Sequence, residues 1–169
     1  MAMGPEVTIS ARKALSVRYQ LLPYLYTLFW EAHVKGDTVS RPLFFEFIND
    51  VQTYDVDTQF LWGPGLMVVP VLEENATAVT AYLPKGLWYD YYTKSPIISK
   101  GESVNLSAPL DTIPLLIRGG YILPQQAPEQ TTTKTRLNKI EILAAADEQL
   151  NAYGQLYWDD GDSLSKSIL

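Results

Sequence analysis

The sequence of 169 residues contains no cysteine and only one histidine, His33. The absence of cysteine excludes disulfides, a thiolate nucleophile and zinc sites built on cysteine. A single imidazole argues strongly against histidine-rich metal sites and against Ser-His-Asp catalysis. We therefore expect no bound metal, no cofactor and no catalytic residue of these classes, and we expect His33 to be a packed side chain of a helix.

Basic residues are few and scattered. Lys and Arg number 13 against 19 Asp and Glu, which gives a net charge of −6. A nucleic-acid interface needs clustered basic residues, so no nucleic-acid partner is expected. No apolar run reaches the ~20 residues that span a bilayer. Residues 1–10 also lack the basic start and apolar core of a signal peptide. We predict a globular chain with neither a membrane span nor a signal peptide.

The most apolar part of the sequence predicts one long helix that ends at Gly36. Thr8 or Ser10 can cap its start, and Pro23 is expected to kink it. Its apolar side chains cover roughly 240° of the helix circumference, whereas a surface helix needs a stripe of only about 100°. Because the strands predicted further along can cover one side of this helix but not the others, we expect an additional protein partner.

Arg18 lies in the middle of this apolar stripe. An unpaired charge is costly to bury, so the sequence predicts a carboxylate or carbonyl partner for its guanidinium. In the alternative interpretation, the aliphatic part of Arg18 packs against the stripe while the guanidinium reaches water.

The sequence after the helix is typical of β structure. Residues 37–47 are expected to be extended, and beyond Gln59 short apolar segments recur every ~8–12 residues, which predicts an antiparallel β-sandwich. Pro84-Lys85-Gly86 is a turn signature and predicts a hairpin between residues 78–83 and 87–92. The other expected strands are 66–72, 103–106, 113–117, 121–123, 140–145 and 153–158.

Composition divides the chain into three parts. Residues 49–58 are polar and turn-rich, and residues 127–139 form a linker rich in Thr, Pro and Gln. We therefore predict a helical segment at 1–48, a β-sandwich at 49–138 and the incomplete start of a second β domain at 139–169, since two strands alone are not a stable unit. The predicted fold class is mainly β with a long N-terminal helix.

The aromatic run at residues 88–92 is one candidate binding site, because aromatic rings stack on sugars. On a strand, Trp88 and Tyr92 share one face while Tyr89 and Tyr91 share the other. Trp88 and Tyr92 are thus a candidate sugar platform. Packing in the core is the favoured alternative for either face.

A second candidate is the acidic run Trp-Asp-Asp-Gly-Asp at residues 158–162. Asp-Gly is a turn signal, so a solvated turn formed by Asp159, Asp160 and Asp162 is favoured. The alternatives are a calcium site, which needs six or more oxygen ligands, and a catalytic pair of carboxylates.

Two sequons, at Asn75 and Asn105, are candidate N-glycosylation sites. Each lies in or beside a predicted turn, where a glycan could be accommodated.

Six sequence motifs, through their order and spacing, carry a resemblance to a known family. The sequence from about Ala11 to Ser163 resembles the C-terminal portion of the α-glucosidases of glycoside hydrolase family 31, in particular the lysosomal acid α-glucosidase, maltase-glucoamylase and sucrase-isomaltase group. The motifs are RYQLLPYLYTLFWEAH, TVSRPLFFEF, QFLWGPGLMVVPVLE, LWYDYYT, APLDTIPLLIRGGYILP and GQLYWDDGDS.

The resemblance implies that the N-terminal helix is the last helix of a (β/α)₈ barrel, followed by a proximal and then a distal β-sandwich. Retaining glycoside hydrolysis needs two carboxyl groups about 5–5.5 Å apart. In this family both are aspartates on barrel strands that precede the last helix, and the nucleophile motif Trp-x-Asp-Met-Asn-Glu does not occur in this sequence. No catalytic residue is therefore carried over.

The resemblance implies a region of a retaining α-glucosidase that acts on maltose and maltooligosaccharides. We expect this region to brace the missing catalytic barrel, which is its predicted partner, and to be inactive alone. The alternatives are a carbohydrate-binding module that works by itself and an inactive fragment. With the sequons, the resemblance implies a secretory route to the lysosome or the cell surface.

Overall fold

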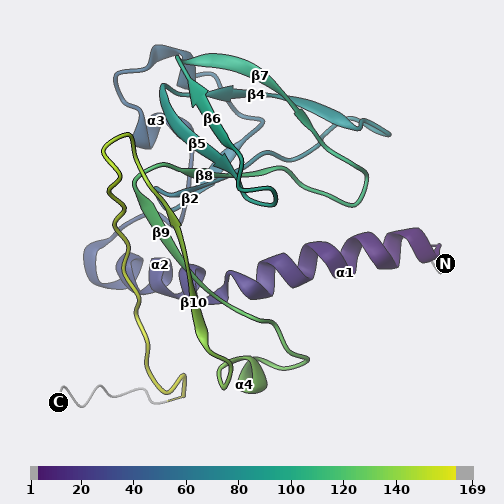
Figure 1. Ribbon diagram of the computed structural model, residues 1–169, viewed down its shortest axis with the longest axis vertical. Coiled ribbons are helices and arrows are strands. Elements are labelled where there is room, and N and C mark those ends of the chain that lie inside the picture. The colour runs from purple at the N-terminus through teal and green to yellow at the C-terminus, as the bar shows by residue number, and fades with distance from the viewer. Residues whose placement is uncertain (1–3, 163–169) are drawn as a thin grey trace.

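The computed structural model describes residues 4–162, and a six-stranded antiparallel sheet forms its centre (Figure 1). The strand order is β1-β2-β3-β8-β5-β6, and two further strand pairs, β4-β7 and β9-β10, pack on its two sides. The strands are β1 (Ser40–Arg41), β2 (Phe60–Trp62), β3 (Leu66–Val68), β4 (Ala78–Leu83), β5 (Gly86–Asp90), β6 (Pro96–Ser99), β7 (Glu102–Ser107), β8 (Leu115–Arg118), β9 (Tyr121–Gln126) and β10 (Ile140–Ala145). The predicted class, mainly antiparallel β with an N-terminal helical part, is confirmed.

The central sheet separates two hydrophobic cores because successive residues of a strand point to opposite faces. In β3, Leu66 and Val68 face the core beneath the N-terminal helices, whereas Met67 faces the core beneath β4 and β7. Leu115 and Leu116 of β8 divide between the two cores in the same way. Each fully buried leucine stabilises the fold by roughly 1.5–3 kcal/mol before the entropic cost of ordering it.

The N-terminal helical part consists of two helices, α1 (Pro5–Gln20) and α2 (Leu22–Lys35), instead of the single helix predicted. The interruption at Leu21 follows from Pro23, which lacks the N–H that would bond to the carbonyl of Tyr19 and whose ring crowds that carbonyl. The helices run end to end past the central sheet (Figure 1).

The ends of these helices match the sequence only in part. The start of α1 corrects the predicted caps: Gly4 is the N-cap residue, and the Ser10 hydroxyl donates to the carbonyl of Glu6 within the helix. The end of α2 is as predicted, because Gly36 adopts a left-handed conformation with φ of 77°. His33, in the last turn of α2, is exposed and not packed as expected, because this side of the helix end is not covered by the described chain.

The predicted hairpin around Pro84-Lys85-Gly86 is wrong. β4 pairs with β7, whereas β5 pairs with β6 and β8, so the turn carries the chain from one sheet to another. A turn signature fixes a change of direction but leaves open which strand becomes the hydrogen-bonded partner.

Three other segments differ from the prediction. Within the expected extended segment, Leu43–Glu46 forms the short helix α3, and a 3₁₀ turn, η1 (Val51–Thr53), follows it. The predicted linker contains the short helix α4 (Thr132–Thr135), which the Thr131 side chain caps. Residues 153–158 make one isolated bridge, from Tyr153 to Tyr121, in place of a strand.

The division into domains stays a prediction. β10 lies beyond the predicted boundary at residue 138, yet it pairs along its whole length with β9, which precedes that boundary. Residues 1–3 of the predicted first part and 163–169 of the predicted last part, including Ser163 of the final motif, lie outside the described residues.

Candidate functional site

The acidic run at residues 158–162 forms a hydrogen-bonded turn. The Asp159 carboxylate accepts from the Gly161 N–H at 2.9 Å, and the Asp160 carboxylate accepts from the Asp162 N–H at 3.1 Å. Such bonds from a side chain to the backbone two residues on are typical of Asx turns. Within residues 4–162, no group of three His, Cys, Asp or Glu side chains could hold a metal ion. The turn predicted from the sequence is confirmed.

Asp159 also fastens this turn to α2. Its carboxylate accepts hydrogen bonds from the Tyr26 hydroxyl at 2.9 Å and the Tyr157 hydroxyl at 2.9 Å, and the Arg136 guanidinium lies 3.8 Å away. Desolvation raises the pKa of Asp159, but these hydrogen bonds outweigh it and hold the pKa below its ordinary value. The lowered pKa favours the ionised carboxylate, whose oxygens accept the hydrogen bonds that hold the turn against α2.

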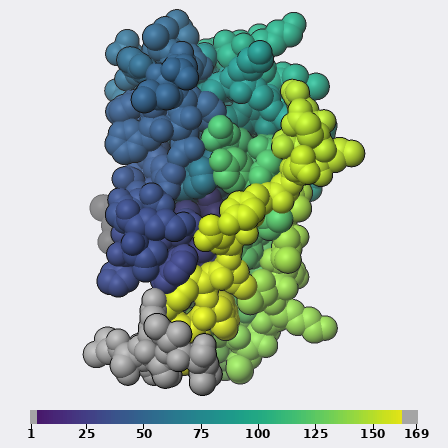
Figure 2. Space-filling view, turned by 90° about the vertical axis from the view of Figure 1, so that its left-hand side faces the viewer, coloured from purple at the N-terminus to yellow at the C-terminus, as the bar shows by residue number. Residues whose placement is uncertain are grey.

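Residues 153–162, which we name the C-terminal strap, cross over α2 (Figure 1 and Figure 2). The Tyr157 ring stacks on Trp30 with centroids 5.0 Å apart, and the Tyr157 N–H donates to the Thr27 hydroxyl. The strap thus covers one side of α2 with aromatic contacts.

The structure does not bring Trp88 and Tyr92 together as a sugar platform. Trp88 is 1% exposed, lies in the core beneath β4 and β7, and donates from its indole N–H to the carbonyl of Pro84. Tyr92 packs against the opposite core, because β5 ends at Asp90 and the alternation of faces ends with it. A ring as buried as Trp88 offers no face to a sugar, so the favoured alternative of core packing describes it.

The two sequon asparagines are both exposed, in different local structures. Asn75 lies in a turn with a left-handed φ of 58°. Asn105 lies within β7, opposite Thr80 of β4, and not in a turn as expected. Their side chains are accessible to modification in this chain.

The structure contains one ionic cluster, centred on Glu46, that the sequence did not predict. Glu46 of α3 pairs with both Arg41 and Arg118, and the Arg118 guanidinium lies 4.4 Å from the centre of the Phe47 ring. The cluster attaches α3 to β8. Because Glu46 and Arg118 are separated by 72 residues, only the fold reveals the pair.

The helices carry a large exposed apolar surface. Leu21 and Leu28 face the core and are 1% and 3% exposed, whereas Leu15 and Phe29 are 52% and 56% exposed. No residue of α1 is buried. The described chain therefore leaves part of the surface of both helices uncovered, as expected, although the C-terminal strap covers a second side of α2 besides the side that packs on the strands. We name the remainder the open helix surface; it comprises Val7, Ile9, Leu15, Tyr19, Phe29 and Val34.

Among residues 4–162 the structure shows no carboxylate or carbonyl partner of Arg18, and the residue is exposed, which agrees with the alternative interpretation. Its guanidinium lies over the Trp62 ring, 5.9 Å from the centroid, at the outer limit of a cation–π contact. No carboxylate of residues 4–162 is within 4.0 Å of it.

Comparison with known proteins identifies the family of this chain. The model of the glycosyl hydrolase family 31 C-terminal domain matches residues 36–123. The chain belongs to glycoside hydrolase family 31. The matched domain includes the central sheet with β4 and β7, and the helices α1 and α2 precede it.

Similar proteins come from animals and bacteria. The lysosomal alpha-glucosidase of Rattus norvegicus is 49% identical over 90% of this chain. The probable maltase-glucoamylase 2 of Homo sapiens is 51% identical over 91%. A glucosidase II alpha subunit superposes with a TM-score of 0.88 at 34% identity over 94% of the chain, and a dextranase of Flavobacterium johnsoniae with 0.82 at 33% over 86%. The chain spans only 6–18% of the length of these relatives.

Proposed function

We propose that this chain is the C-terminal region of a retaining α-glucosidase that releases terminal α-1,4-linked glucose from maltose and maltooligosaccharides. In this proposal the chain braces the catalytic barrel, and the two catalytic aspartates belong to that barrel. Relatives named lysosomal alpha-glucosidase and maltase-glucoamylase, near 50% identity, support the substrate class.

The open helix surface is the observation that carries the bracing role. Monomeric proteins seldom expose contiguous apolar patches of more than a few hundred Å², and larger ones mark interaction sites. The helices α1 and α2 would be the last barrel helix, and the rest of the barrel would cover Leu15, Tyr19 and Phe29. Asp159 and its neighbours are engaged in a turn, which supports a catalytic pair located elsewhere.

A secretory route, ending in the lysosome or at the cell surface, is part of the proposal. It is supported by relatives named as lysosomal and intestinal enzymes and by the exposure of Asn75 and Asn105, which we propose as glycosylation sites. No helix among residues 4–162 is both long and apolar enough to cross a membrane.

A chimera tests the proposed function. In the rat lysosomal alpha-glucosidase, the aligned segment is replaced by this chain, and hydrolysis of an aryl α-glucoside is measured for the chimera and for the isolated chain. We expect turnover from the chimera and none from the isolated chain. Turnover by the isolated chain at the 1–10³ s⁻¹ typical of enzymes, or a folded chimera without activity, would overturn the proposal.

A further inference from the structure

Arg18 is exposed and has no acidic partner among residues 4–162. The neighbouring Lys13 is neutralised, because its ammonium lies 2.8 Å from the Asp111 carboxylate and also donates to the Thr112 hydroxyl. Arg18 has only the Trp62 ring. The described chain therefore presents one uncompensated guanidinium on the side of α1 that faces the sheet.

Beside Arg18 lies an apolar socket of about 230 Å³ between α1 and the central sheet. A cavity of about 150 Å³ lined by aliphatic side chains is known to hold benzene, so this socket can hold one large side chain. Its apolar walls include Leu21, Leu66, Leu115 and the Trp62 ring, and the mutually paired Lys13 and Asp111 also line it.

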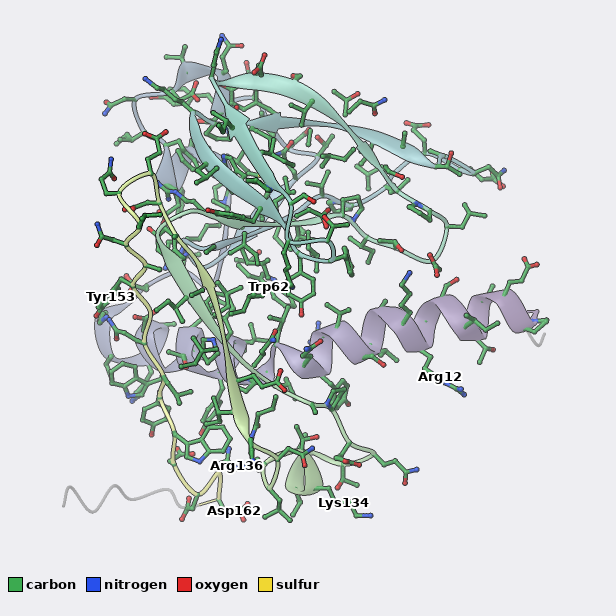
Figure 3. All side chains as sticks on the ribbon, in the orientation of Figure 1. Arg12, Trp62, Lys134, Arg136, Tyr153 and Asp162 are labelled. Atoms are coloured by element: carbon green, nitrogen blue, oxygen red, sulfur yellow. The ribbon has the colours of Figure 1, made fainter. Side chains whose placement is uncertain are left out.

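The socket is continuous with the open helix surface. Leu15 lines the socket and is at the same time 52% exposed. In Figure 3 Trp62 points from the sheet toward the helix, whereas Arg12 points away from the sheet on the other side of α1. A partner that covers Leu15 therefore also reaches the socket and Arg18.

We propose that Arg18 and the socket form a two-part docking site for the catalytic domain of the same enzyme, in which an acidic side chain pairs with the guanidinium while a neighbouring apolar side chain fills the socket. This inference rests on the proposed function. The planar guanidinium favours a carboxylate, which it binds through two parallel hydrogen bonds. Closure of the interface removes water from the pair, so loss of one partner leaves a buried charge unpaired.

Charge reversal in the chimera described above tests the ionic half of the site. Arg18→Glu is compared with Arg12→Glu, which reverses the same charge on the same helix away from the socket. We expect Arg18→Glu to lower the melting temperature of the chimera by about 5 °C and Arg12→Glu by about 1 °C. Arg18→Lys keeps the positive charge but loses the planar pair of N–H donors. We expect the melting temperature of this chimera to lie between those of Arg18→Glu and the unmutated chimera.

The isolated chain separates docking from intrinsic helix stability. Arg18 lies in the last turn of α1, where an acidic residue opposes the helix dipole. We therefore expect Arg18→Glu to shift the melting temperature of the isolated chain by no more than about 2 °C. A shift as large in the isolated chain as in the chimera would overturn the docking role.

The apolar half is tested by filling the socket. Ala14 lines the socket and Ala11 does not, although both are exposed on α1. Ala14→Trp should reduce the yield of active chimera at least fivefold, whereas Ala11→Trp should change it less than twofold. Equal effects of the two variants would overturn the inference.

The chimera experiments distinguish a failure of the proposed function from a failure of the docking site. If the unmutated chimera is folded but inactive, the proposed function fails. If it is active and Arg18→Glu behaves like Arg12→Glu, only the docking site fails. Octanoate is the probe for binding of a small amphipathic carboxylate in the socket. The docking site is overturned, and the socket is assigned to a ligand, if octanoate raises the melting temperature of the isolated chain, Arg18→Glu abolishes this increase, and Arg18→Glu leaves the melting temperature of the chimera unchanged.

Discussion

The Tyr26 hydroxyl of α2 donates to the Asp159 carboxylate at 2.9 Å, across 133 residues of sequence. This bond joins the second helix to the last described part of the chain. Because Tyr157 donates to the same carboxylate and stacks on Trp30, the C-terminal strap and α2 form one packed unit.

Removal of the Asp159 charge should loosen the strap. We expect Asp159→Asn to lower the free energy of unfolding by about 1 kcal/mol, since the hydrogen bonds are charge-assisted but solvent reaches the site. Urea denaturation measures the change. Asp57→Asn, in the exposed loop before β2, is the matched control and should change the stability by less than about 0.5 kcal/mol.

The same carboxylate predicts a response to acid. The pKa of Asp159 is lower in the folded chain than in the unfolded chain. Its stabilising contribution is therefore complete above its ordinary pKa of about 3.9 and is lost as the pH falls through the lowered folded value. Tryptophan fluorescence of the isolated chain, followed from pH 6 downward, should report release of the strap only under these acidic conditions. In Asp159→Asn this transition should be absent, and an unchanged transition would contradict the assignment.

Trp88 should matter for stability and not for sugar binding. Truncation of this buried ring by Trp88→Ala is expected to lower the free energy of unfolding by about 3–5 kcal/mol. Tyr92→Phe, which removes the hydrogen bond from the hydroxyl to the carbonyl of Ile113, should cost about 1 kcal/mol. Calorimetric titration of the intact chain with maltoheptaose should show no saturable binding. Saturable binding that Tyr92→Phe weakens without unfolding the chain would restore the sugar platform.

The open helix surface should make the isolated chain self-associate. Leu15→Ser together with Phe29→Ser removes two exposed apolar side chains from it, and light scattering should then show a lower average mass at equal concentration. Ile98→Ser on β6 is the control, because Ile98 is 74% exposed but belongs to another surface. If Ile98→Ser lowers the mass as much as the helix variants do, association does not depend on the helices.

Local patterns in the sequence predicted local structure well. Gly36 ends α2 as expected, β10 has the predicted bounds of residues 140–145, and the Asp-Gly turn forms. These features depend on a few adjacent residues, and glycine conformation or alternation of apolar residues is sufficient to specify them.

Pairings between distant residues were not predictable in the same way. The partner of β4 is β7 and not β5, and the partner of Glu46 is Arg118, because these choices depend on how whole sheets pack. Trp88 illustrates the limit: the sequence placed it on one face of a strand, and only the packing of β4 and β7 shows that this face is closed. The break at Leu21 reflects Pro23, which was recognised as a kink but not as a division into two helices.

Hydroxyl-radical footprinting of Leu15, Tyr19 and Phe29 tests the bracing role most directly. The side chains are labelled in the isolated chain and in the active chimera under the same conditions, with Ile98 as an internal reference exposed in both. We expect strong labelling of the three helix residues in the isolated chain and at least fivefold protection in the chimera, with Ile98 unchanged. Equal labelling of the helix residues in an active chimera would contradict the claim that this chain braces a catalytic barrel through α1 and α2.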